Sequence, residues 1–147
     1  MLPRLRILFL CTGNSCRSQM AEGWARHLLG DRLEAGSAGT APGRLDPRAV
    51  RVMGEAGVDI SGHRSKSLAE VSGAGFDWVV TVCDHANETC PVFPGETLRM
   101  HVGFDDPPRL AAESSSEEEA LVPYRRVRDE IRAFVADLPR RLEGPVS

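Results

Sequence analysis

The sequence predicts an α/β domain with a four-stranded parallel sheet flanked by helices. Runs of apolar and β-branched residues at 5–10 and 78–82 are typical of strands that are buried on both faces. Segments with helical spacing of apolar residues lie between the predicted strands, and this alternation is typical of a parallel sheet. Because ligands bind beyond the carboxyl ends of such strands, we expect a functional site at that edge.

The first strand, at residues 5–10, is followed by a helix and a second strand. The helix is predicted over 18–29 and ends at Gly30. A short second strand is expected at 34–38, although glycines weaken this prediction. The apolar face of the helix consists of Met20, Ala21, Trp24, Ala25, Leu28 and Leu29.

Asp46 and Pro47 mark the start of the next helix, because Asp caps helices and proline fits their first position. This helix extends to Gly57, and a shorter helix is expected at 67–71. The predicted apolar face of the longer helix consists of Ala49, Val50, Met53 and Ala56.

The second half of the chain supplies strands at 78–82 and 98–102 and a long closing helix at 124–142. Pro139 is expected to bend this helix or to end it early. The acidic run at 114–119 is predicted to be a solvated loop or a frayed helix start. The closing helix buries Val127, Ile131, Phe134, Val135 and Leu138.

Length and composition indicate one soluble domain that spans residues 1–147. The net charge of −3 argues against nucleic-acid or anionic-membrane binding, so no such partner is expected. The apolar run at 7–11 is too short for a membrane span or a secretory signal. We therefore expect a cytoplasmic protein, and nothing demands more than a monomer.

The segment between the first strand and the first helix is predicted to bind a tetrahedral oxyanion. Cys11 is separated by five residues from Arg17, and Ser18 opens the helix. A loop of this length aims backbone N–H groups at one centre, and the helix N-terminus adds positive potential. Arg17 supplies paired donors, and the same field favours a nucleophilic thiolate at Cys11. The other loop residues are Thr12, Gly13, Asn14, Ser15 and Cys16.

A leaving oxygen needs a proton donor, and Asp105 and Asp106 are the candidates. They follow the fourth predicted strand and precede two prolines, which stiffen the turn. Adjacent acids before proline are also common in turns, where Asp bonds its own backbone. The residues alone leave both interpretations open.

The remaining cysteines allow several interpretations. On a continuous helix Cys83 and Cys90 would lie about 10 Å apart, whereas a disulfide needs Cα atoms within about 7 Å. A bond between them therefore requires the segment to loop. Zinc binding with His85 or His63 fits poorly, because zinc-binding pairs are usually about two to four residues apart. Cys16 is predicted to be packed in the core and inert.

These residues resemble the thioredoxin-coupled arsenate reductases, which are built on the low-molecular-weight tyrosine phosphatase fold with its anion-binding P-loop after strand 1. The resemblance covers nearly the whole chain and includes three separate cysteine positions. It is carried by residues 9–24, 37–39, 59–61, 79–83, 90–91, 103–107 and 126–131.

The resemblance implies a function in arsenic detoxification (arsenical resistance), with arsenate as substrate. Cys11 would attack arsenate held by Arg17, and Asp106 would protonate the departing oxygen. Cys83 would then attack Cys11, releasing arsenite, and Cys90 would take over the disulfide. Thioredoxin would reduce that final bond, although an external low-molecular-weight thiol is the alternative reductant.

The resemblance also assigns supporting roles. Asn14, Ser18, Ser37 and His63 would hold the loop by hydrogen bonds. In well-known members a potassium ion is held partly by groups matching Asn14, Glu22 and Ser37. Two further potassium ligands, a Thr and an Asp, are here replaced by Arg64 and Lys66.

We therefore expect no metal or other cofactor, with Lys66 pairing with Glu22 in place of the ion. The alternative is that Arg64 and Lys66 face solvent. The acidic segment at 113–119 is longer than the corresponding connection in the family, and we assign it no function.

Two other functions remain open at this point. A low-molecular-weight phosphatase, acting on phosphotyrosine or a small phosphate ester, would share Cys11, Arg17 and Asp106 but has no use for Cys83 and Cys90. A non-catalytic arsenic- or zinc-binding protein would use three thiols. The thiol pair therefore favours the reductase.

Overall fold

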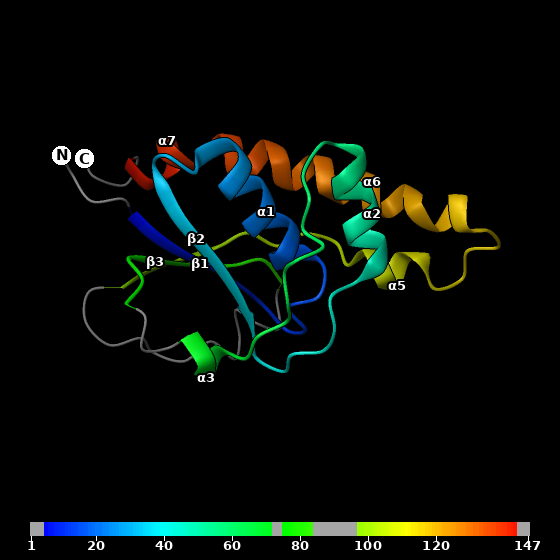
Figure 1. Cartoon of the computed structure of the whole chain (residues 1–147), viewed down its shortest axis with the longest axis horizontal. Helices are drawn as coiled ribbons and strands as arrows, with labels where there is room; N and C mark the ends of the chain where they lie inside the picture. The colour runs from blue at the N-terminus through cyan, green and yellow to red at the C-terminus, as the bar shows by residue number, and fades with distance from the viewer. Residues whose placement is uncertain (1–4, 72–74, 84–96, 144–147) are drawn as a thin grey trace.

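A computed structural model describes residues 5–71, 75–83 and 97–143. It contains a four-stranded sheet in the order β2-β1-β3-β4 with every neighbouring pair parallel, which confirms the predicted fold class (Figure 1). The strands are β1 (Leu5–Cys11), β2 (Leu33–Gly39), β3 (Trp78–Thr81) and β4 (Leu98–His101). Each lies within one residue of its predicted bounds.

Three helices cover the sheet around one core. Helix α1 (Arg17–Leu29) packs on β1 and β2, and α6 (Glu117–Ala136) packs across α1 and α2 (Pro47–Glu55). The short α3 (Leu68–Val71) contacts β2, and α5 (Pro107–Ala111) contacts α6 (Figure 1). As predicted, α1 ends at a Gly30 cap and α2 begins at an Asp46 cap.

The strand register brings distant residues to one edge of the sheet. Leu10 pairs with Thr81, so Cys83 follows β3 beside the point where Cys11 ends β1. Cys11 itself pairs with Gly39 at the end of β2. The carboxyl ends of the strands therefore meet at the loop that follows β1, where we expected the site.

The predicted apolar face of α2 is wrong in part. The helix ends at Glu55, and its buried residues are Ala49, Val52 and Met53. Val50 is only half-buried and Ala56 is exposed. Positions i, i+3 and i+4 share one helix face, so contact with α6 selects Val52 in place of Val50.

The closing helix starts earlier than residue 124 and is interrupted. Ser116 caps α6 by accepting a hydrogen bond from the Glu119 N–H, so the end of the acidic run is the first turn of the helix. Negative charge is favourable there because it faces the positive end of the helix dipole. α6 ends at Ala136, and α7 (Leu138–Glu143) carries Pro139 at its second position. The expected interruption at Pro139 is thus confirmed.

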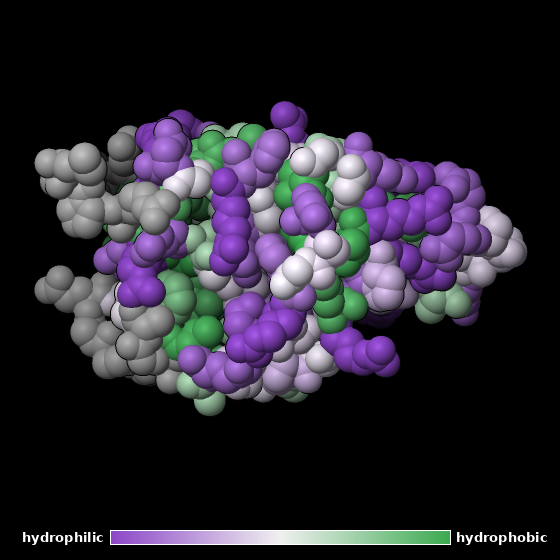
Figure 2. All heavy atoms as spheres, viewed as in Figure 1, coloured by the Kyte–Doolittle hydropathy of each residue, from purple (hydrophilic) through white to green (hydrophobic). Residues whose placement is uncertain are grey.

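The face of the molecule seen in Figure 2 is predominantly polar. Figure 2 shows hydrophilic residues over much of one face, with apolar residues in separate small areas. Among the residues that the structure describes, no helix has the length and apolar character needed to cross a membrane.

Candidate active site

The loop after β1 borders two adjoining pockets at the carboxyl edge of the sheet. One, of about 280 Å³, is lined by loop residues together with Arg17 and Asp106. The other, of about 470 Å³, is lined by Thr12, Arg17, Cys83 and Asp106 among others. The structure therefore brings together the predicted nucleophile, the arginine, both candidate acids and the second cysteine.

Cys11 is buried and its sulfur is surrounded by donors. Ser18 Oγ lies 2.8 Å from Cys11 Sγ, and the Asn14 N–H donates to the same sulfur at 3.3 Å. Both contacts stabilise negative charge on sulfur, because hydrogen bonds to the charged form favour it. This is the environment that a thiolate nucleophile needs.

The loop carbonyls are turned away from the pocket by the segment 40–46. This segment donates backbone hydrogen bonds to four carbonyl oxygens of the loop. The pairs are Thr40 to Cys11 at 3.1 Å and, at 2.9 Å each, Ala41 to Thr12, Gly43 to Gly13 and Asp46 to Ser15. In a planar trans peptide the next N–H points opposite to the carbonyl, so the loop N–H groups face the pocket. The Asn14 N–H, directed at Cys11 Sγ, fits this orientation.

The two candidate acids have different partners in the structure. Asp106 lies 3.6 Å from Arg17 across the pocket, and its side chain makes no capping bond at the start of α5. Asp105 instead pairs with Arg126 on α6 at 2.9 Å. Both acids line the pocket that contains Cys83, but only Asp106 also lines the pocket that contains Cys11. Arg17 is also held by the Phe104 carbonyl at 2.8 Å, which fixes the guanidinium at the pocket wall.

The cysteines occupy different environments. Cys83 is buried beside the loop, with its Sγ 3.5 Å from Thr12 Oγ1. Cys16 is buried, and burial and then the Asp46 carboxylate raise the pKa of its thiol well above the ordinary value. Cys16 is thus packed in the core as predicted. Cys90 and His85 lie outside the described residues, so the third thiol of the expected relay is not placed.

Asn14 adopts a positive φ of 49°, and its contacts hold this uncommon conformation. Its Nδ2 donates to Ser18 Oγ at 2.9 Å, and its Oδ1 accepts from the Lys66 N–H at 2.8 Å. The Ser65 hydroxyl donates to its carbonyl at 2.7 Å. The segment 63–66 therefore also supports the anion loop, at Asn14.

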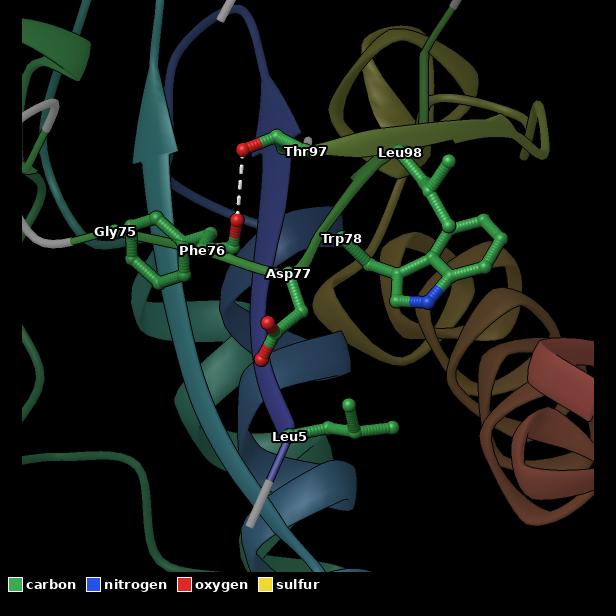
Figure 3. A pocket seen from close by; sticks show the side chains of 7 residues that line it. All are labelled: Leu5, Gly75, Phe76, Asp77, Trp78, Thr97 and Leu98. Carbon is green, nitrogen blue, oxygen red and sulfur yellow. Dashed lines mark hydrogen bonds between the residues drawn. The ribbon is translucent and has the colours of Figure 1, made fainter. Parts of the chain in front are cut away.

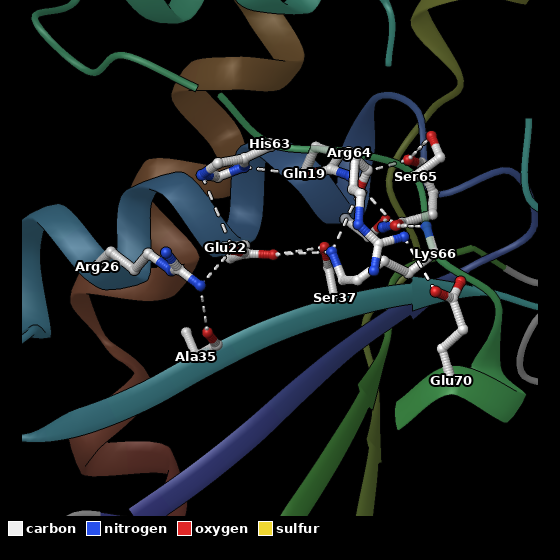
Figure 4. A network of polar contacts seen from close by, with 12 residues as sticks. Gln19, Glu22, Arg26, Ala35, Ser37, His63, Arg64, Ser65, Lys66 and Glu70 are labelled. Atoms are coloured by element: carbon white, nitrogen blue, oxygen red, sulfur yellow. Dashed lines mark hydrogen bonds and ion pairs between the residues drawn. The ribbon is translucent and has the colours of Figure 1, made fainter. Parts of the chain in front are cut away.

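Glu22 lies buried beneath this segment, at the centre of a polar network (Figure 4). Its carboxylate accepts from Ser37 at 2.6 Å and pairs with Arg26 at 2.8 Å. Lys66 Nζ lies 4.0 Å from Glu22, and His63 Nε2 lies 3.7 Å away. Burial lowers the pKa of Lys66 and of His63, and in both cases Glu22 opposes the shift. The network ties α1 to β2 and to the segment that holds Asn14.

Arg64 and Lys66 are placed differently. Arg64 is exposed and pairs with Glu70 on α3 at 3.0 Å (Figure 4). Lys66 is mostly covered, and its Nζ donates to the Arg64 carbonyl at 3.1 Å. The alternative that both residues face solvent is therefore correct for Arg64 and wrong for Lys66.

Sequence reasoning missed Gln19, which is fully buried. Its Nε2 donates to the carbonyls of Asn14 and Arg64, both at 3.0 Å, and its Oε1 lies 2.9 Å from His63 Nδ1 (Figure 4). Gln19 thereby joins the loop to the 63–66 segment. The signal was available, because Gln19, Glu22 and Arg26 form a polar stripe at helical spacing on α1.

A larger pocket, of about 490 Å³, lies at the opposite end of the strands and lacks such chemistry (Figure 3). Its lining includes Leu5, Phe76, Trp78 and Leu98. The carboxylate of Asp77, also in the lining, accepts the Arg6 N–H at 2.8 Å. Among the described residues, no cluster of three or more His, Cys, Asp or Glu could hold a metal ion.

Comparison with known proteins agrees with this geometry. An arsenate reductase of Halalkalibacterium halodurans is 50% identical over 85% of this chain and 88% of its own length. A solved arsenate reductase in the phosphate binding state has a TM-score of 0.73 at 28% identity, covering 93% of this chain and 98% of its own. The low molecular weight protein tyrosine phosphatase from T. tengcongensis has a TM-score of 0.71 at 29% identity, covering 93% and 99%.

The sequence profile of the low molecular weight phosphotyrosine protein phosphatases matches residues 6–145. Because this match spans nearly the whole chain, the protein belongs to that family.

Proposed function

We propose that the protein is an arsenate reductase that uses Cys11 as nucleophile and Cys83 and Cys90 as a disulfide relay. The observation that carries the proposal is the position of Cys83, which shares a pocket wall with Thr12, Arg17 and Asp106. A hydrolase of the same family would use the loop, the arginine and the acid, but a second thiol there serves only thiol chemistry. Relatives about half identical to this chain carry the name arsenate reductase.

The first step is attack of the Cys11 thiolate on arsenic. The loop N–H groups and Arg17 hold the arsenate oxygens, and Asp106 protonates the oxygen that leaves as water. Ser18 and Asn14 stabilise the thiolate before attack. The product is a covalent bond between Cys11 and pentavalent arsenic.

The second step is redox chemistry. The Cys83 thiolate attacks Cys11 Sγ, the sulfur–arsenic bond breaks, and arsenic leaves with its electron pair as arsenite. A Cys11–Cys83 disulfide remains. Cys90 then attacks Cys83, which restores the Cys11 thiol and leaves a Cys83–Cys90 disulfide. A dithiol protein of the thioredoxin class returns the two electrons. This cycle begins with reduced thiols, which the cytoplasm maintains, so we place the protein there. We also propose that it acts as a monomer.

The decisive assay is arsenate-dependent oxidation of NADPH with thioredoxin and thioredoxin reductase. Wild type is expected to turn over many times, whereas Cys83→Ser and Cys90→Ser stop after at most one turnover. Cys16→Ser is the comparison for loss of a thiol: Cys16 belongs to the anion loop but not to the relay, so its variant can bind arsenate differently yet should still turn over many times. Because thioredoxin is the only reductant in this assay, unchanged turnover of Cys90→Ser would contradict a role for Cys90 in the relay.

The phosphatase alternative has weaker support. The family profile and the T. tengcongensis structure favour it only as family context. The chain's single tyrosine, Tyr124, is buried against Asp46, so it is not available to stack on a phosphotyrosine ring. Hydrolysis of p-nitrophenyl phosphate should therefore be slow, and efficient hydrolysis without arsenate reduction would favour the phosphatase.

We also propose that Lys66 supplies the positive charge that potassium gives in related enzymes, so that no metal cofactor is needed. The ammonium lies 4.0 Å from the buried Glu22 carboxylate and is itself largely covered. Reductase rates in potassium and sodium chloride at equal ionic strength test this. Equal rates are expected, and a strong, specific rise with potassium would contradict it.

A further inference from the structure

We propose that Asp46 and Tyr124 form a positioning pair that holds the anion loop in its binding conformation from behind. The inference deepens the proposed function, on which it rests in taking this loop as the oxyanion site. Neither residue touches the pocket that Cys11 lines. Both would act through segment 40–46 on the orientation of the loop peptides.

The first step is the contact itself. The Tyr124 hydroxyl donates to Asp46 Oδ2 at 2.5 Å, between residues 78 positions apart in the chain. Tyr124 is 1% exposed, so the packed core around α6 fixes its ring. Burial and then the bond to Asp46 raise the pKa of Tyr124, so the hydroxyl stays a donor throughout the physiological range. A hydrogen bond to a charged carboxylate is among the stronger hydrogen bonds in proteins.

The second step is that Asp46 has three fixed contacts. Its Oδ1 accepts the Arg48 N–H at 2.9 Å and caps α2, while its Oδ2 accepts from Tyr124. Its own backbone N–H donates to the Ser15 carbonyl at 2.9 Å. Asp46 therefore couples two helices to one peptide of the anion loop.

The third step connects Asp46 to the binding groups. It ends the segment 40–46, whose N–H groups hold the carbonyls of Cys11, Thr12, Gly13 and Ser15. While these carbonyls stay bound, the following N–H groups face the pocket. If the contacts of Asp46 are lost, the loop peptides can rotate. Anion binding by backbone donors depends on the direction of their N–H groups, so it would become weaker.

A consequence for the second thiol of the loop agrees with this arrangement. The Asp46 carboxylate, after burial, raises the pKa of Cys16. The charge behind the loop thus keeps Cys16 protonated while Cys11 faces the donors of Ser18 and Asn14. Asp46 therefore both holds the loop and, after burial, contributes to the raised pKa of Cys16.

The test compares Tyr124→Phe, Asp46→Ala and Asp46→Asn with a matched control, Arg125→Ala. Arg125 ties α6 to α2 through Glu55, at 2.8 and 2.9 Å, and within the described part of the chain it makes no hydrogen bond to the loop or to segment 40–46. Three quantities are measured: the phosphate dissociation constant by calorimetry, the pH profile of Cys11 alkylation by iodoacetamide, resolved by peptide mass spectrometry, and thermal unfolding.

Tyr124→Phe is expected to weaken phosphate binding by about 3- to 10-fold, the range for loss of one hydrogen bond. It should also shift the alkylation profile of Cys11 to higher pH. Asp46→Ala should weaken binding further, and Asp46→Asn should recover only part of that loss, because one amide oxygen cannot accept from both Arg48 and Tyr124 as the two carboxylate oxygens do. Arg125→Ala should lower the unfolding temperature and leave the phosphate constant within about 2-fold.

The inference is overturned if Tyr124→Phe lowers only the unfolding temperature, as Arg125→Ala does, while phosphate binding and the alkylation profile stay unchanged. Because these measurements need no turnover, they are independent of the arsenate assay. A wild type that fails to reduce arsenate refutes the proposed function alone, since the effect of Tyr124→Phe on phosphate affinity would still support the positioning pair.

Discussion

Thr12 Oγ1 lies 3.5 Å from Cys83 Sγ, between residues 71 positions apart in the chain. The contact follows from the parallel register of β1 and β3, which ends one strand at the nucleophile and the other just before the second thiol. Within the described residues, Cys11 and Cys16 are free thiols. Cys83 thus lies beside the loop, in contact with Thr12, the residue that follows Cys11.

Thr12→Val should slow the step in which Cys83 attacks. The valine keeps the shape of threonine but removes the hydroxyl beside the sulfur, so the reductase kcat is expected to fall by about 3- to 10-fold. The phosphate dissociation constant should change less, because Thr12 contributes to anion binding through its N–H. Steady-state kinetics and calorimetry measure the two effects. Thr12→Ser should restore kcat, and equal losses in both quantities would contradict a role toward Cys83.

Gly39→Ala should disturb the anion loop directly. A Cβ at Gly39 would lie 2.5 Å from the Thr12 carbonyl oxygen and 3.0 Å from the Asn14 nitrogen, so backbone must move. We expect the free energy of unfolding to fall by about 1–3 kcal/mol, and phosphate affinity to fall with it.

Gly43→Ala is the matched control, because nothing lies within 4 Å of a Cβ there. It should change stability by less than about 1 kcal/mol, in the stabilising direction, by restricting the unfolded chain. Urea unfolding of both variants measures the difference. Similar stability losses in the two variants would mean that the close approach at Gly39 does not matter.

Glu22→Gln should destabilise the protein, because it removes the buried charge that faces Arg26 and Lys66. Breaking a buried ion pair on one side leaves the partners uncompensated, and a loss of at least about 2 kcal/mol is expected. Glu34→Gln is the matched control, since its partner Arg6 and Glu34 itself are both about half exposed. That variant should lose less than about 1 kcal/mol. Equal losses of stability in the two variants would contradict the prediction that the buried Glu22 ion pairs stabilise the protein more than an exposed pair does.

His63 should make stability fall as the pH is lowered. Burial holds the pKa of His63 below its ordinary value, while Glu22 opposes the shift and Arg26 and Lys66 add to it. The unfolded chain therefore binds the proton first, and the free energy of unfolding decreases as the pH falls from about 6.5 toward the folded pKa.

Ring-proton NMR titration measures this pKa directly, with His63→Gln identifying the resonance. The same variant should show a flatter stability profile over that pH range. A midpoint for His63 at or above about 6.5 would contradict the prediction.

Much of the site could be predicted because its chemistry is local. The strand, the five-residue loop and the helix that begins at Arg17 are contiguous, so their spacing was enough to locate the anion loop. The face of α2 and the start of α6 were predicted less well. Both depend on which residues meet across the contact between these helices, and periodicity alone allows neighbouring choices such as Val50 or Val52.

The sequence by itself determined a parallel α/β fold, an anion loop between Cys11 and Arg17, and a set of candidate thiols and acids. Only the tertiary structure decided that Asp106 faces the loop while Asp105 pairs with Arg126, and that Gln19 joins two segments of the site. It also placed segment 40–46 against the loop carbonyls. The physical reason is that strand and helix formation depends on near neighbours, whereas these contacts join residues that only sheet register and helix packing bring together.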